Sequence, residues 1–319
     1  ENWDANNPTG KTGSRNIQVA GTEFLVNVGV VDDYFNLVKN YATDVKLNTP
    51  TDLYAANVDT VAINTSAGYT DAISVTLKRA ATDHSLSADD YLLALGSDPD
   101  PLNPKPSTFT VTPRYPVGLQ LLLPGQIAKP GSGNYPNGGL DVTGIISTRT
   151  AGVAFPVTVK LVDQYMNQYS YPSAHPNFGL PKFWVTSNDL YDIDLPTRTL
   201  DNGSFTPNMN LVTKTNAAVI SAWADPSDAV CGPTASSVCR AGFAEAPAAQ
   251  PGAFKVWAAA ATQLAVTLPG ETLVPGKCAV SPDVVCRRLG ANEVPGKSGA
   301  PPPFTIQEPL TTMTAKVYL

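Results

Sequence analysis

Four cysteines are the residues with the clearest chemistry in this chain, and they form two equally spaced pairs. Cys231 and Cys239 enclose seven residues, as do Cys278 and Cys286. Zinc sites prefer about two to four residues between neighbouring ligands and usually recruit histidine, whereas the two histidines of this chain are remote from every cysteine. The spacing therefore predicts two local disulfides, Cys231–Cys239 and Cys278–Cys286, and an oxidising environment outside the cytoplasm.

The two histidines do not belong to a recognisable catalytic pattern. His84 and His175 both lie in loop-like segments, without a G-x-S-x-G nucleophile motif or an H-E-x-x-H zinc motif. The Gly131–Gly133 segment leads into a loop and not into a helix that could bind a phosphate. We therefore expect surface histidines, no cofactor and no enzymatic activity.

Two further sets of polar residues could bind or be modified. Asp189, Asp192 and Asp194 could ligate calcium from a loop, or could equally form the polar face of a strand and turn. Asn64 and Asn202 each begin an Asn-x-Ser/Thr glycosylation pattern. Asn202 also precedes a glycine, and Asn-Gly favours a tight type I′ turn.

The chain repeats itself. Ala20–Asn36 and Ala151–Asn167 are identical at nine of seventeen positions without a gap. A second block repeats at another offset, in Leu119–Gly131 and Leu264–Gly276. The first repeat lacks the Leu-Pro-Gly block and the last repeat stops partway, so we expect modules that assemble into something longer.

The first repeated block predicts a strand that leads into a turn. Hydrophobic residues alternate with a period of two, which is typical of a strand with one buried face. Both copies then reach Asp-x-Tyr-x-Asn, at Asp32–Asn36 and at Asp163–Asn167. Asp and Asn side chains bond to nearby backbone in tight turns. We expect both segments to be architectural turns, with a calcium site as the alternative.

Later segments can also be matched between the repeats. Residues 60–65 are similar in character to Phe183–Ser187, and Phe109–Val111 matches Phe254–Val256. No segment has helical periodicity with capping residues. About seven short strands per repeat, separated by Pro and Gly, predict an all-β fold built of sandwich modules.

Composition favours a secreted, loop-rich protein. The 319 residues include 29 Pro and 24 Gly, and only 15% are charged. A hydrophobic content of 43% is too high for a disordered chain. The net charge of −6 argues against nucleic acid as a partner. No apolar run is long enough to span a bilayer.

Several of these motifs combine into one pattern. It contains LPG-[EQ], AG-x-x-F-x-V-x-V, V-D-x-Y-x-N, VTS-[ND] and L-x-NGSF, and it covers Lys11–Asn36, Leu119–Asn167, Trp184–Asp189, Leu200–Phe205 and Leu264–Gly276. The pattern resembles the bacterial immunoglobulin-like (Big-type) domains that occur in tandem in extracellular and surface proteins. The resemblance implies tandem immunoglobulin-like β-sandwich modules and a role as a spacer, adhesin or surface-structure component.

The repeats suggest both a division of the chain and a function. We expect an N-terminal tail at 1–7, a first module at 8–116 without its Leu-Pro-Gly strand, a second at 117–260, and an incomplete third at 261–319. The preferred hypothesis is a non-enzymatic structural subunit of an extracellular filament or cell-surface layer. The alternative is an adhesin or carbohydrate-binding stalk fragment of a larger repeat protein.

Assembly would follow from the missing strand of the first module. Such a module exposes an unpaired edge, and a strand from the third module of another copy could complete it. The candidate donor residues are Gln263, Leu264, Val266, Leu268, Met313, Ala315, Val317 and Leu319. The aromatic-rich group Tyr165, Met166, Tyr169 and Tyr171 could contact either another subunit or a glycan.

Overall fold

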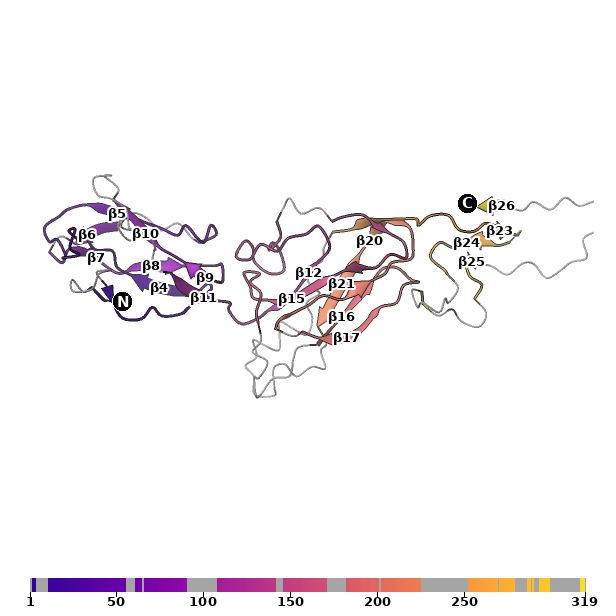
Figure 1. The fold of residues 1–319 in the computed structure, drawn as a ribbon, viewed down its shortest axis with the longest axis horizontal. Helices are drawn as coiled ribbons and strands as arrows, with labels where there is room; N and C mark the ends of the chain where they lie inside the picture. The colour runs from indigo at the N-terminus through magenta and orange to yellow at the C-terminus, as the bar shows by residue number, and fades with distance from the viewer. Residues whose placement is uncertain are drawn as a thin grey trace, which may run out of the picture. The chain divides into compact units, whose positions relative to one another are not determined.

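All the regular secondary structure that the computed structural model describes is β-strand, which confirms the all-β fold class (Figure 1). The described residues are 2–3, 11–55, 61–64, 66–90, 108–141, 146–170, 182–200, 202–224, 252–268, 270–278, 286–287, 289, 293–298 and 316–318. The chain divides into two compact units. The first comprises residues 1–117, 129–140 and 162–169, and the second comprises the remainder. Two segments of the second repeat are therefore part of the first unit.

The first unit contains the strands of the first repeat. These are β1 (Asn2–Trp3), β2 (Lys11–Thr12), β3 (Gln18–Val19), β4 (Glu23–Val26), β5 (Asp44–Asn48), β6 (Val61–Asn64), β7 (Tyr69–Thr70), β8 (Ile73–Thr76), β9 (Ala81–His84), β10 (Ser87–Asp90) and β11 (Phe109–Thr112). A four-stranded sheet has the order β10-β5-β6-β7 and a three-stranded sheet has the order β3-β11-β9. Alternate residues of these strands point inward and form the core, which includes Val45, Leu47, Ile63, Ile73, Val75 and Val111.

The second unit contains the strands of the second repeat and the described part of the third. These are β12 (Gly118–Leu122), β13 (Arg149–Thr150), β14 (Phe155–Pro156), β15 (Thr158–Val162), β16 (Lys182–Ser187), β17 (Leu195–Thr199), β18 (Ser204–Phe205), β19 (Asn208–Met209), β20 (Thr215–Ala218), β21 (Ile220–Ala224), β22 (Phe254–Trp257), β23 (Ala265–Thr267), β24 (Thr272–Leu273), β25 (Lys297–Ser298) and β26 (Lys316–Tyr318). Three-stranded sheets have the orders β12-β15-β18, β17-β16-β21 and β13-β22-β20.

Strand pairing recurs between the repeats with matching register. β11 pairs in parallel with β3, with Val111 opposite Gln18, and in antiparallel fashion with β9. β22 pairs in parallel with β13, with Val256 opposite Arg149, and in antiparallel fashion with β20. The matched segments Phe109–Val111 and Phe254–Val256 therefore have the same neighbours in their own units.

One sequence match was wrong. β16 pairs with both β17 and β21, and β5 pairs with both β6 and β10. Strand β16, which contains Phe183–Ser187, thus corresponds to the central strand β5 and not to β6 in residues 60–65. Short alternating strands are similar in composition, so position in the sheet, and not character, distinguishes them.

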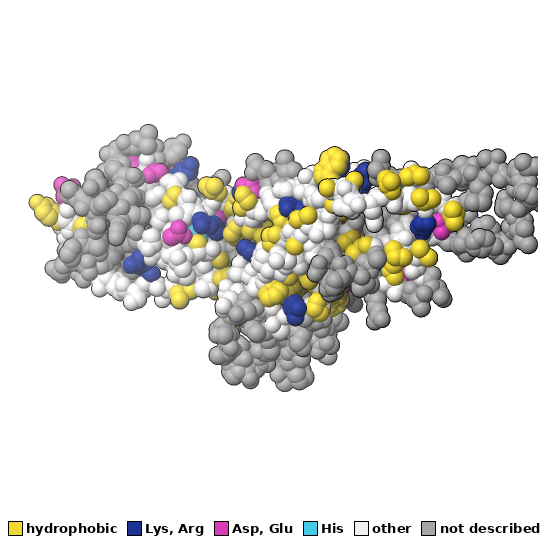
Figure 2. Space-filling model, turned by 45° about the vertical axis from the view of Figure 1, so that its right-hand side comes forward, with side chains coloured by type: hydrophobic (Ala, Val, Ile, Leu, Met, Phe, Trp, Pro, Cys, Tyr) yellow, Lys and Arg dark blue, Asp and Glu magenta, His cyan; other side chains and the backbone are white. Residues whose placement is uncertain are grey.

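The surface and the secondary structure of the molecule bear on two kinds of partner, nucleic acids and membranes. On the face drawn in Figure 2, Lys and Arg side chains are scattered singly among hydrophobic and uncharged ones. The side chains described on that face do not form a basic patch of the kind that nucleic acid binding requires. Among the residues described, no helix has the length and hydrophobicity to cross a membrane.

Candidate assembly site

The Asp-x-Tyr-x-Asn turn of the second repeat, Asp163–Asn167, is stabilised by its own aspartate. Oδ1 of Asp163 accepts hydrogen bonds from the backbone N–H groups of Tyr165 (2.8 Å) and Asn167 (3.0 Å). Oδ2 accepts one from Asn167 Nδ2 at 2.9 Å. Met166 has a φ of 65°, in the left-handed region that such turns use. The expectation of a turn held by side-chain bonds is confirmed here.

The Asp163–Asn167 turn is buried in the first unit and is called the engaged turn. Asp163 is 0% exposed and Asn167 is 1% exposed. The Asn167 amide donates to Lys78 O and accepts from Ala80 N, both at 2.8 Å. Asp163 Oδ2 also accepts from Arg114 N at 3.0 Å. The turn therefore fastens a segment of the second repeat onto a loop of the first.

The Tyr165 ring completes this contact. Tyr165 packs against the core of the first unit. Gly21 has a φ of 71°, and a methyl group there would overlap the Tyr165 ring. Tyr165 O also accepts from Gly131 N at 2.9 Å. A left-handed glycine next to the strand thus leaves the space that the tyrosine occupies.

Burial gives the two aspartates of the repeated turn different electrostatics. Burial raises the pKa of Asp163 above its ordinary value, against the lowering effect of its hydrogen bonds. The pKa of the exposed Asp32 is lowered, chiefly by the hydrogen bond from the Asn36 side chain. The same motif therefore carries a buried carboxylate in one repeat and a solvated one in the other.

A second aspartate, Asp52, which no sequence pattern had indicated as important, fixes the Lys78–Arg79 loop that the engaged turn contacts. Asp52 is buried, and its Oδ2 accepts from Lys78 N (2.6 Å) and Arg79 N (2.9 Å). In the second repeat, Asp189 Oδ2 accepts from Val212 N and Thr213 N, both at 2.7 Å. The only sequence signal is the shared Asp-Leu-Tyr that begins at each aspartate.

The strand that leads into the turn has a different environment in each repeat. In the second repeat, β15 pairs with β18 on one edge and with β12 on the other, and Val162 O accepts from Val117 N at 2.8 Å. Val159 in β15 is 0% exposed. Its equivalent in the first repeat, Val28, is only half-buried.

The equivalent segment in the first repeat, Asn27–Val31, follows β4, forms the isolated bridges Gly29–Tyr69 and Val31–Leu37 on one edge, and has its other edge unpaired among the described residues. Thr70 N donates to Val28 O (2.8 Å), and Val30 N donates to Gly68 O (3.0 Å). Gly29 and Val31 alternate with these residues, so their N–H and C=O groups point to the opposite edge. Among the described residues, no strand or loop pairs with that edge, where β12 lies in the second repeat.

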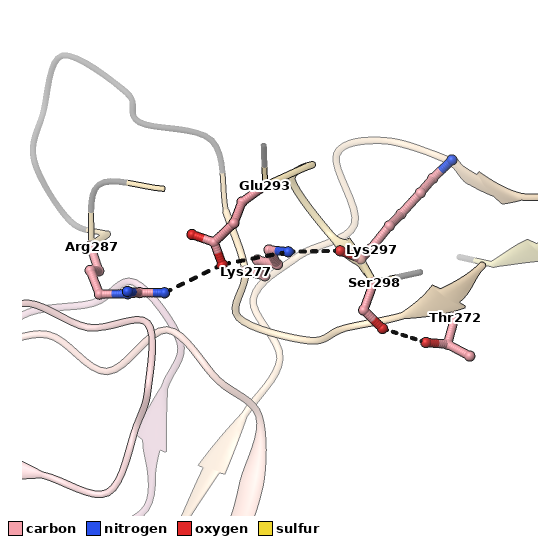
Figure 3. A network of polar contacts seen from close by, with 6 residues as sticks. All are labelled: Thr272, Lys277, Arg287, Glu293, Lys297 and Ser298. Atoms are coloured by element: carbon pink, nitrogen blue, oxygen red, sulfur yellow. Dashed lines mark hydrogen bonds and ion pairs between the residues drawn. The ribbon is translucent and has the colours of Figure 1, made fainter. Parts of the chain in front are cut away.

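The third repeat contributes a short hairpin to the second unit. β24 and β25 pair, and Thr272 bonds Ser298 at 2.7 Å. Figure 3 shows Lys277 donating to Lys297 O at 2.9 Å. Glu293 lies 3.8 Å from Lys277 Nζ and 3.6 Å from Arg287 (Figure 3).

One predicted disulfide is present beside this hairpin. Cys278 is bonded to Cys286, with Cα atoms 6.2 Å apart. Arg287, next to Cys286, donates its N–H to Tyr191 O at 2.7 Å. The disulfide therefore closes a loop whose end contacts the second repeat. Cys231 and Cys239 lie outside the described residues.

The candidate donor strands pair with each other. β23 is antiparallel to β26, with Val266 opposite Val317. Apolar side chains on this ribbon are exposed at Leu264 (63%), Val266, Leu268 and Val317, and Gln263 is exposed as well. An isolated two-stranded ribbon is marginally stable in water. Met313, Ala315 and Leu319 lie outside the described residues.

The three candidate calcium ligands have protein partners. Asp189 also accepts from Tyr191 N (3.1 Å) and Thr213 Oγ1 (2.6 Å). Asp192 accepts from Ser187 Oγ at 2.7 Å, and Asp194 accepts a long bond from Ser187 N at 3.4 Å. Within the described part of the chain, no group of three or more His, Cys, Asp or Glu is arranged to hold a metal ion.

Asp192 should make stability depend on pH. Burial, aided by the neighbouring charges of Asp189 and Asp194, raises its pKa from 3.8 to about 6. The folded state then binds the proton more tightly than the unfolded chain does, so stability should fall as pH rises from about 4 to about 6. The variant Asp192→Asn should gain stability relative to wild type over this range, as measured by urea unfolding between pH 4 and pH 8. A constant difference between the two curves would contradict the prediction.

The structure places both candidate glycosylation residues, Asn64 and Asn202. Asn64 is exposed and accepts from Ser66 Oγ at 2.8 Å. Asn202 and Gly203 have φ values of 50° and 72°, as a type I′ turn requires. The turn connects β17 to β18, which belong to different sheets, and so does not close a hairpin.

Two surface expectations were wrong. His84 is buried, with Nε2 at 2.7 Å from Arg79 O and Nδ1 at 3.0 Å from Thr51 Oγ1. Met166 is also buried, because its turn is engaged in the first unit. Of the other members of the aromatic-rich group, Tyr165 and Tyr169 are half-buried. His175 and Tyr171 lie outside the described residues.

Two features of the described surface bear on the carbohydrate-binding alternative. A cavity of about 170 Å³ lies between residues 188–191 and the segment from Leu211 to Ala218. Ligand pockets are usually larger, at about 300 Å³ or more. Trp257 is exposed, but Lys255 Nζ lies 3.4 Å from its ring centroid and covers one face.

Comparison with known proteins assigns no family. No family model and no curated protein matches the chain. The adhesin InvE of Yersinia pseudotuberculosis is similar at 18% identity and a TM-score of 0.24, over 66% of this chain and 53% of the adhesin chain. The native α2-macroglobulin of E. coli is similar at 12% identity and a TM-score of 0.28, over 81% of this chain and 17% of that one. The chain thus spans about half of the adhesin, and neither likeness is strong enough to carry a functional argument.

Proposed function

We propose that this protein is a non-enzymatic structural subunit of an extracellular filament or surface layer, built of immunoglobulin-like modules that join head to tail by strand addition. The observation that carries the proposal is the edge of Asn27–Val31 in the first repeat, with which no described residue pairs. The same strand has its edge covered by β12 in the second repeat. An open edge beside half-buried hydrophobic residues is a template for another strand.

The donor we propose is β23 of a second copy, with its flanking residues Gln263–Leu268. Its sequence matches β12, and it follows the second repeat as β12 follows the first. Its apolar side chains are exposed, whereas those of β12 are buried. Main-chain hydrogen bonds would supply affinity and alternate side chains would fill the apolar strip.

β26 has a defined place in this scheme. Aligning the alternating residues Met313, Ala315, Val317 and Leu319 with Phe24, Val26, Val28 and Val30 places Lys316–Tyr318 opposite Asn27–Gly29 of the first repeat and Thr158–Lys160 of β15. It pairs with β23 in the same chain. We propose that β26 holds the edge of β23 until the Asn27–Val31 segment of a second copy replaces it. The cysteine pairs and loop-rich composition support an extracellular location.

Electron microscopy of the purified protein tests the proposal. Wild type should form filaments, and Val266→Pro should abolish them because proline cannot donate to a strand ladder. Ala260→Pro, in the neighbouring exposed loop, is the control and should leave filaments intact. Deleting residues 314–319 should preserve or speed assembly. A wild type that stays monomeric at high concentration, or filaments that survive Val266→Pro, would overturn the proposal. Monomers that bind glycans in an array would support the adhesin alternative.

A further inference from the structure

The Asp-x-Tyr-x-Asn turn occurs twice in one conformation but is engaged only once among the described residues. In the free turn, Asp32–Asn36, Asp32 Oδ1 accepts from Tyr34 N and Asn36 N, both at 2.9 Å, and Oδ2 accepts from Asn36 Nδ2 at 2.9 Å. Phe35 has a φ of 62°, as Met166 has 65° in the engaged turn. Tyr34 is 77% exposed. The free turn is therefore preformed for the contact that the engaged turn makes.

The engaged turn also accepts hydrogen bonds from the N–H groups of Arg114 and Tyr135, and four further features of its surroundings have counterparts in the second unit. These are the space above Gly21, the carbonyl of Lys78, the N–H of Ala80 and the N–H of Gly131. Three belong to the first repeat, and Gly131 belongs to the Pro-Gly turn that follows the Leu-Pro-Gly strand. A site with these four features can accept a turn of this kind.

The second unit has the same features in equivalent positions. Gly21 N donates to Leu77 O, and Gly152 N donates to Leu211 O, both at 2.7 Å. The two glycines are therefore equivalent, and so are the loops that follow Leu77 and Leu211. Val212 O and Lys214 N then correspond to Lys78 O and Ala80 N. Neither has a hydrogen-bond partner among the described residues.

Two glycines extend the equivalence. Gly131 packs on Arg79, and Gly276 packs on Thr213 in the same way. Gly152 has a φ of 77°, and nothing described lies within 4 Å of a methyl group built on it. Gly21, by contrast, is covered by Tyr165. Gly152, Val212 O, Lys214 N and Gly276 therefore reproduce four features of the site that holds the engaged turn, and no described residue occupies them. They are called the open site.

We propose that the free turn of one copy docks into the open site of a second copy. Tyr34 would lie over Gly152, and the Asn36 amide would bond Val212 O and Lys214 N. Gly276 N would donate to Tyr34 O. The inference rests on the proposed function and adds a specific second contact to strand addition. Because the two halves differ and belong to one chain, the contact is heterologous and propagates.

A cysteine pair tests this geometry directly. The variant Asn36→Cys/Lys214→Cys should give a ladder of disulfide-linked multimers on a non-reducing gel under oxidation. Neither single variant should give a ladder. A mixture of the two single variants should stop at dimers. The internal pair Ala80→Cys/Asn167→Cys, at the engaged turn, is the positive control and should form a disulfide within one chain.

The outcomes separate this inference from the proposed function. A ladder together with filaments supports both. Filaments without a ladder, when the internal control forms, overturn the docking contact and leave strand addition standing. The absence of both filaments and ladder overturns the two together.

A second measurement does not depend on disulfide geometry. Tyr34→Ala should raise the critical concentration for assembly by about tenfold or more, as expected for an interfacial tyrosine. Tyr115→Ala removes a tyrosine of similar exposure outside the docking site and should change it less than about twofold. Equal effects of the two variants would contradict the docking contact.

Discussion

Replacing Asp163 by alanine is expected to lower the free energy of unfolding by about 3 kcal/mol. Its carboxylate accepts four hydrogen bonds, from Arg114 N, Tyr165 N, Asn167 N and Asn167 Nδ2. Alanine would leave the buried Asn167 amide with one partner fewer and would loosen the turn, which is itself part of the first unit. Urea unfolding at neutral pH measures the loss.

Asp32→Ala is the matched control. It removes an aspartate of the same motif with the same hydrogen bonds to its own turn, but the turn is exposed. Water can replace the lost bonds, so the stability of the isolated chain should change far less than with Asp163→Ala. Equal losses from the two variants would show that the turn bonds alone, and not burial in the first unit, determine the effect.

This pair also marks the limit of what the sequence could reveal. The motif, its turn and its aspartate hydrogen bonds follow from local residue types, and they were predicted correctly. Which copy is buried depends on Lys78, Ala80 and Arg114, which are remote from both copies in the sequence. Local patterns carry no information about such contacts. The expectation that Met166 could contact another subunit or a glycan was wrong for this reason.

Other features also separate into those that local sequence predicts and those that depend on remote contacts. The Cys278–Cys286 loop and the alternating strands were predictable because spacing and periodicity are local properties. The roles of Asp52 and Asp189 were not, since each fixes a loop more than twenty residues further along the chain. His84 looked like a loop residue, but its two ring nitrogens bond Thr51 and Arg79 within the fold.

The second large effect concerns the Leu-Pro-Gly strand. Leu119→Ala is expected to lower the free energy of unfolding by about 3 kcal/mol, because the side chain is 2% exposed and its removal leaves a cavity. Leu264→Ala makes the same substitution at the equivalent position of the third repeat. That side chain is 63% exposed, so the isolated chain should change by less than about 0.5 kcal/mol.

In assembled filaments, Leu264→Ala should no longer have a negligible effect. If β23 completes the first repeat of a second copy, Leu264 becomes buried there as Leu119 is within its own repeat. Leu264→Ala should then raise the critical concentration for filament formation while the monomer melts normally, with light scattering and thermal unfolding as the two measurements. Leu268→Ala, paired with Leu123→Ala, repeats the comparison four residues further along each copy of the block, where Leu268 is exposed and Leu123 is buried. Unchanged assembly in both exposed-site variants would mean that the exposed leucines of the third repeat do not enter the first repeat of another copy, and that the open edge of Asn27–Val31 is completed by some other strand.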